Sequence, residues 1–175
     1  MKITEDKITT ISKEDFDKLS ESEKRISVIK DVLSRISIGQ IKPHTGAFCS
    51  FRSVLLSEKL SSELENPKLH CESCAKGSLF LSYIGIVNNY NSKLYFVDGQ
   101  NNDSNEMMML SNIFTSKQLS LIETAFENCY YDWNEQLTQL EISSCCTFAN
   151  KYKGDNKRLI AICENIIENK GSFKL

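Results

Sequence analysis

Apolar residues recur every three or four positions along most of this chain, which is the spacing of a helix with one buried face. The spacing is most regular over residues 21–38. Ser20 stands three residues before Glu23, so each side chain can bond the other residue's free backbone N–H at a helix start. Gly39 supplies the left-handed backbone that ends many helices. We therefore predict a helix over 21–38.

Further helices follow from the same spacing. Residues 72–88 are apolar almost all round, which indicates a central helix buried on several sides. Thr115 stands three residues before Gln118, with Phe114 and Leu119 placed to pack together, and this is the clearest helix start in the chain. Less regular patterns predict the remaining helices over 50–63, 103–113, 133–150 and 155–170, with Asp103 and Asp155 as the caps of the second and fourth.

These patterns predict a mainly α fold, a compact single-domain bundle of about six helices over residues 20–175. Residues 1–19 are polar, and we expect a loosely held N-terminal arm there with at most one helical turn near 13–19. The short run Leu94–Val97 is the one β-rich segment, so a strand or hairpin near 93–98 completes the prediction.

Composition and charge narrow the classes of function. The chain has 175 residues, enough for one hydrophobic core without metals or disulfides. Its net charge is -2 with acidic and basic residues interleaved, and it lacks the basic stripe that duplex DNA binding requires. No apolar run reaches the roughly 18 residues of a membrane span, and the N-terminus has no signal-peptide pattern. We expect a cytoplasmic protein that does not contact membranes.

The seven cysteines cannot all pair within the chain, because their number is odd. In the cytosol thiols stay reduced, so we expect buried small hydrophobes, metal ligands or a nucleophile in place of a disulfide framework.

The densest cluster of reactive residues surrounds Cys71 and Cys74 at C-x-x-C spacing, directly after His70. Two such thiolates can share one Zn²⁺ if the fold adds two more ligands. Cys145 and Cys146 could supply one or two of them, and His44 or His70 another. A redox pair is the other alternative, although the βαβ setting it requires is absent. We expect these cysteines to pack in the core as small hydrophobic residues, with no bound metal or cofactor. Cys74 and Cys163 should be buried inside helices, and Gly77 should allow another helix to approach closely.

A cysteine nucleophile is the remaining catalytic alternative. Cys49 follows a Gly-containing turn and precedes a predicted helix, and His70 could serve as its base if the fold brings the two together. No serine elbow, phosphate-binding loop or H-E-x-x-H segment occurs. The sequence therefore favours a protein that is not an enzyme.

Several segments together resemble small uncharacterised proteins of bacteria and their phages. They are Lys30–Leu33, Gly39 with Thr45–Gly46, the Cys71-x-x-Cys74-Ala75-x-Gly77 stretch with Leu79–Ser82, Gln118–Glu127 and Arg158–Ile162. The resemblance spans residues 26–173 and implies a phage or mobile-element accessory protein. It implies no activity and no catalytic residue.

The functional expectation is a non-enzymatic binding protein that occludes a host defence or regulatory component. Its candidate contact residues lie within the Asn-rich stretch 88–105 or directly after it. They are aromatic or Met side chains, which provide contact area: Tyr90, Tyr95, Phe96, Met107 and Met108. The alternatives are a nucleotide-binding sponge that uses Lys76, Lys93, Arg52 and Arg158 for phosphates, and the cysteine enzyme. The partner's identity and a homodimeric state stay open.

Overall fold

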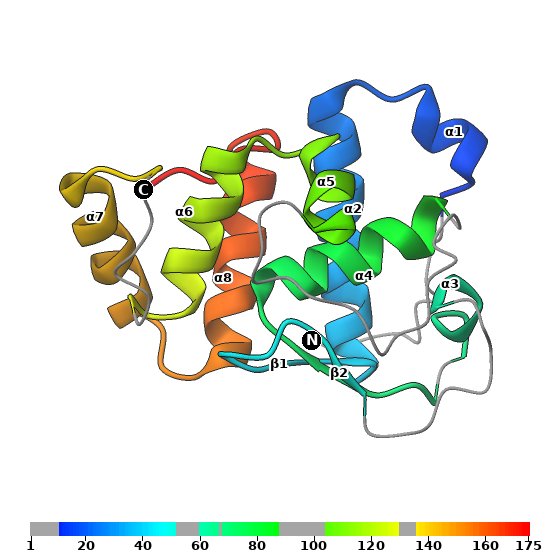
Figure 1. Ribbon diagram of the computed structural model, residues 1–175, viewed down its shortest axis with the longest axis horizontal. Coiled ribbons are helices and arrows are strands. Elements are labelled where there is room, and N and C mark those ends of the chain that lie inside the picture. The colour runs from blue at the N-terminus through cyan, green and yellow to red at the C-terminus, as the bar shows by residue number, and fades with distance from the viewer. Residues whose placement is uncertain (1–10, 52–59, 67, 88–103, 130–135) are drawn as a thin grey trace.

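The structure, a computed structural model, describes residues 11–51, 60–66, 68–87, 104–129 and 136–175. It is mainly helical with a small three-stranded sheet (Figure 1), and the predicted fold class is confirmed. The strand predicted near 93–98 lies outside the described residues, and the sheet is built from other segments.

The first two helices begin where the sequence places them. Helix α1 (Lys13–Asp17) is the predicted turn of the N-terminal arm, and its Phe16 is buried with its ring centroid 6.1 Å from that of Tyr83. Helix α2 (Glu21–Ser37) starts with the predicted capping box, in which Ser20 and Glu23 each bond the other's backbone N–H. Gly39, at φ +76°, provides the left-handed turn that follows α2.

The sheet joins three short segments that the sequence pattern did not reveal. Strand β1 (Ile41–Pro43) pairs in parallel with β3 (Cys71–Ser73), and β2 (Ser50–Phe51) pairs antiparallel with the other edge of β3. The helix predicted over 50–63 is therefore wrong at its start, because the backbone of β2 bonds to β3 instead of to the next helical turn. Helix α3 (Leu60–Glu63) occupies its end.

Helix α4 (Ala75–Val87) is the central helix that the apolar run predicts, but it begins three residues later than predicted because Cys71–Ser73 form a strand. It packs against α2, α1 and α3, and against the later helices α5 (Asn105–Ser111) and α6 (Ser116–Phe126). Ten of its thirteen residues are buried. Each large apolar side chain buried in this way contributes about 1.5–3 kcal/mol.

The later helices keep the predicted order with shifted boundaries. Ser104, one residue beyond the predicted Asp103, caps α5 by accepting from the Met107 N–H, and Thr115 caps α6 as predicted. Helices α7 (Gln139–Asn150) and α8 (Asp155–Glu168) follow. Gly154 precedes α8, so Asp155 is its first residue and not its cap.

Helices α2, α6 and α8 lie side by side, with α4 crossing in front of α2 (Figure 1). Among the described helices, none combines the length and the apolar character needed to cross a membrane.

Two side-chain amides hold the C-terminal segment on the helices. Gln118 of α6 donates to the Phe173 carbonyl at 3.3 Å and accepts from the Phe173 N–H at 2.7 Å. Asn165 of α8 likewise donates to the Lys174 carbonyl at 2.8 Å and accepts from the Lys174 N–H at 2.9 Å. The side chain of Phe173 is buried in the core as a result.

One pair of cysteines departs from the expectation of reduced thiols. Cys129, which follows α6, and Cys146 of α7 form a disulfide with an S–S distance of 2.01 Å. Their pairing follows from the packing of α6 on α7, which brings together residues 17 positions apart. Cys49, Cys71, Cys74, Cys145 and Cys163 carry free thiols.

Candidate functional site

The junction of β3 and α4 places the second cysteine of the C-x-x-C pair at a helix start. The Cys74 N–H donates to the Ala47 carbonyl, and the Gly77 N–H lies 3.5 Å from Cys74 Sγ. Cys74 is thus the residue that caps α4, since its sulfur accepts from the first turn as a serine hydroxyl would. It is buried as predicted, although it precedes the helix instead of lying inside it.

Gly77 allows a close approach to α4, but the approaching segment is not the helix that the sequence predicted. A Cβ at this position would lie 1.6 Å from the Phe48 carbonyl oxygen. The segment that approaches α4 here is therefore the backbone between β1 and β2, and not another helix.

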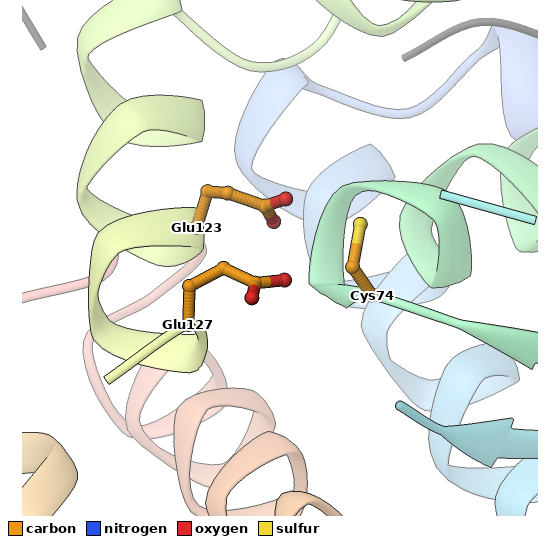
Figure 2. A group of neighbouring side chains, drawn as sticks. All are labelled: Cys74, Glu123 and Glu127. Carbon is orange, nitrogen blue, oxygen red and sulfur yellow. The ribbon is translucent and has the colours of Figure 1, made fainter. Parts of the chain in front are cut away.

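Two carboxylates of α6 point at Cys74 (Figure 2). Glu123 lies in the last turn of α6 and Glu127 directly follows the helix, four residues on and so over the same face. Glu123 Oε2 accepts from the Lys76 N–H at 3.1 Å, and both oxygens of Glu127 lie 3.0 Å from the Gly46 N–H. One ligand atom from each of Cys74, Glu123 and Glu127 lies within 4.8 Å of the other two. We call these three residues the thiol–carboxylate cluster.

The cluster gathers acidic groups in a poorly solvated place, and this changes their proton affinity. Burial raises the pKa of Glu127 to about 7, and the charges of Glu123 and Asp155 act in the same direction. The Gly46 N–H and the Arg158 guanidinium oppose the shift. Burial, followed by the charge of Glu123, also raises the pKa of the Cys74 thiol well above its usual range. Near neutral pH the cluster therefore holds protons that solvent-exposed carboxyl groups would have lost.

Arg158 and Asp155 at the start of α8 are the other charged residues that act on Glu127. Arg158 Nη1 donates to the Phe126 carbonyl and lies 3.6 Å from Asp155 Oδ1, while the Thr45 N–H donates to Asp155 Oδ2 at 2.9 Å. Asp155 was predicted as a cap of its own helix. Its carboxylate instead secures the turn after β1.

A sulfur and two carboxylates are a donor set that can hold a metal ion. Of the ligand candidates from the sequence, the described structure places Cys74 alone in this cluster. Cys146 is in the disulfide with Cys129, and His44 Nδ1 lies 2.6 Å from the Thr45 carbonyl. His70 Nδ1 lies 2.9 Å from the Gly39 carbonyl, Cys71 Sγ lies 3.4 Å from the Glu72 carbonyl, and Cys145 Sγ lies 3.5 Å from the Leu121 carbonyl. The sequence signal for the two missed residues is their spacing of four on a helix, which is common on solvated helix faces.

A pocket of about 140 Å³ lies beside the cluster, between α4, α5 and α6. It is lined by Lys76, Met107, Met108, Ser111, Ser116, Leu119 and Ser120. Leu119 and Ser120 precede Glu123 by one helical turn, so the pocket and the cluster share one face of α6. Met108 is 60% exposed, whereas Met107 is buried.

Of the five predicted contact residues, two lie at this pocket and three cannot be placed. Met107 and Met108 both line the pocket. Tyr90, Tyr95 and Phe96 lie outside the described residues.

We compared the chain with family models, curated proteins and solved structures. None of them matches it. The resemblance to bacterial and phage proteins stays a prediction.

The proposed nucleophile Cys49 lacks the environment that activates a thiol. Its pKa is raised well above the usual range, first by burial of the sulfur and then by the neighbouring Cys71. Cys49 Sγ lies 3.9 Å from the Gly77 carbonyl, whereas the exposed His70 bonds to Gly39. These contacts do not bring the two residues together as a nucleophile and its base.

Proposed function

We propose that this protein is a non-catalytic binding protein that holds a protein partner at the pocket between α4, α5 and α6. The observation that carries the proposal is Met108, a large apolar side chain that is 60% exposed at a pocket with one charged lining residue, Lys76. Exposed Met side chains provide adaptable contact area for partners.

The size of the pocket favours a single inserted side chain over a whole nucleotide. Its volume is about 140 Å³, whereas pockets for small ligands span roughly 300–1,000 Å³. The sponge alternative also required Arg158, whose guanidinium is buried and bonded to the Phe126 carbonyl. Arg52 and Lys93 lie outside the described residues.

The lining of the pocket indicates the chemistry of the inserted group. The Lys76 ammonium and the Ser116 hydroxyl are hydrogen-bond donors at this pocket, whereas the Ser111 and Ser120 hydroxyls already donate to the Met108 carbonyl and to Gln136 Oε1. The Met and Leu119 side chains form an apolar wall. A carboxylate on a short apolar stem satisfies both parts. We therefore expect the partner to present an Asp or Glu side chain, or a C-terminal carboxylate. In the phage setting that the sequence resemblance implies, the partner is a host component that the protein occludes.

The thiols support a role without catalysis. Burial raises the pKa of Cys145 to about 11, and it raises the pKa of Cys49, Cys74 and Cys163 as well. A nucleophilic cysteine instead needs a lowered pKa, because the thiolate is the reactive form.

Site-specific crosslinking in the cells that produce the protein tests the contact site. A photo-crosslinking residue replaces Met108 in one variant and Leu140 in the other. Leu140 is the matched control, because it is 78% exposed on α7 and does not line the pocket. We expect position 108 to yield one dominant crosslinked peptide that contains an acidic residue or a C-terminus, and position 140 to yield none. Equal products at both positions would contradict the proposal.

Charge reversal tests the carboxylate. Lys76→Glu should weaken the crosslink at position 108 at least tenfold, because it sets two negative groups against each other. Lys157→Glu on α8 makes the same change in net charge at an exposed position outside the pocket, and it should leave the crosslink intact. An unaffected crosslink in Lys76→Glu would show that the Lys76 ammonium does not bind the partner.

A further inference from the structure

The thiol–carboxylate cluster has the dimensions of a metal site. Its three ligand atoms come from two elements that pack on each other, the start of α4 and one face of α6, and they lie within 4.8 Å of one another. Bond lengths of about 2.0–2.3 Å around Zn²⁺ place neighbouring tetrahedral ligands roughly 3.5 Å apart. Both Glu side chains already point toward Cys74 (Figure 2), so the approach that a bound ion requires runs along that direction.

The two carboxylates of the cluster are suited to bind a cation. Glu127 is only 5% exposed, and Glu123 lies on the same face one turn away. In the described part of the chain, neither carboxylate forms an ion pair with a side chain, and the nearby Arg158 is bonded to the Phe126 carbonyl. Buried charges in proteins are generally either paired or coordinated to metals. The buried Glu127, with the partly buried Glu123 and the Cys74 thiol beside it, can meet this requirement by coordinating a metal ion.

We propose that Cys74, Glu123 and Glu127 bind one divalent transition-metal ion of the zinc class. The sulfur decides the class, because Mg²⁺ and Ca²⁺ take oxygen ligands and Ca²⁺ requires six to eight of them. Zn²⁺ accepts both thiolate and carboxylate ligands. Three protein ligands leave a fourth position for water or another small ligand. This site is independent of the proposed partner pocket.

Backbone N–H groups already orient the ligands from outside. Lys76 N–H holds Glu123 at 3.1 Å, Gly46 N–H holds Glu127 at 3.0 Å, and Gly77 N–H lies 3.5 Å from Cys74 Sγ. Ligating carboxylates in metal sites are commonly fixed by such outer hydrogen bonds. The thiol proton passes to solvent when sulfur bonds the metal, and the N-terminus of α4 stabilises the thiolate that remains.

Cobalt and zinc titrations of the chelator-treated full chain test the site. Co²⁺ bound to a thiolate gives a near-ultraviolet charge-transfer band, and Zn²⁺ added afterwards should abolish it. We expect one Zn²⁺ per chain by mass spectrometry of metal content. Glu123→Gln and Glu127→Gln keep the side-chain shape and should each weaken Zn²⁺ binding at least tenfold, with circular dichroism showing that the variants fold. Cys74→Ala should lose the band.

Two other cysteine variants serve as controls. Cys163→Ala changes a buried cysteine of α8, and Cys71→Ala changes the other cysteine of the C-x-x-C pair. Both should keep the band and the stoichiometry. A band that disappears in Cys71→Ala but persists in Glu123→Gln would place the metal on thiols and overturn the proposal. Failure of the unaltered chain to bind Zn²⁺ more tightly than the Glu123→Gln/Glu127→Gln double variant would overturn it as well.

Discussion

Replacing Gly77 by Ala tests how closely the backbone between β1 and β2 approaches α4. The added Cβ would lie 1.6 Å from the Phe48 carbonyl oxygen and 2.7 Å from its carbon. Carbon and oxygen in contact are about 3.3 Å apart, so the two segments would have to separate by about 1.7 Å. The turn cannot move alone, because the Gly46 N–H is bonded to Glu127 and the Ala47 carbonyl to Cys74.

The expected cost follows from three terms. Overpacking costs about 1–3 kcal/mol, and one disturbed backbone hydrogen bond adds about 1 kcal/mol. The higher helix propensity of alanine stabilises the folded state by about 1 kcal/mol and offsets part of this cost. We expect the free energy of unfolding to fall by about 2 kcal/mol.

Urea denaturation followed by circular dichroism measures this change as a lower midpoint with an unchanged slope. Gly39→Ala is the control, because its Cβ meets nothing within 4 Å and only the positive φ of +76° is strained, at a cost of about 1 kcal/mol. A Gly77→Ala variant that is more stable than the unaltered chain would show helix propensity acting alone, and would refute the close approach.

Two further outcomes are expected. In chelator, the stability advantage of Glu127→Gln over the unaltered chain should grow by about 3 kcal/mol as pH rises from 4.5 to about 7. In that window the unfolded carboxyl is already ionised while the buried one keeps its proton, so folding of the unaltered chain weakens with rising pH; urea midpoints that differ equally at pH 5 and pH 8 would contradict this. Reducing the Cys129–Cys146 disulfide, which spans 17 positions, should lower the free energy of unfolding by about 3 kcal/mol. Denaturation with and without reductant measures it, and the double Ser variant should not respond.

Local signals account for the parts of the fold that the sequence predicted. The Ser20–Glu23 box and the Thr115 cap lie within four residues of the helices they start, so their meaning does not depend on the rest of the chain. The strands could not be found in this way. Ile41 pairs with Cys71 across thirty positions, and strands of two or three residues are too short to show an alternating pattern.

The candidate site could be predicted only in part, because only one of its residues belongs to a local sequence pattern. The C-x-x-C spacing drew attention to Cys74, and burial of this residue was predicted correctly. Glu123 and Glu127 were missed, because a pair of acidic residues four apart on a helix usually faces water. What brings them to Cys74 is the packing of α6 on the start of α4, and no local pattern encodes that contact.

The neighbouring positions of α2 and α8 constrain how the protein folds during synthesis. These helices pack together, and Ser22 reaches the Lys170 carbonyl 148 positions away. Ser37 at the end of α2 and Glu168 at the end of α8 are 131 positions apart. At roughly 5–20 residues per second, the ribosome needs on the order of 10 s to add them. Throughout that interval the face of α2 that α8 covers is open to chaperones, until α8 packs on it.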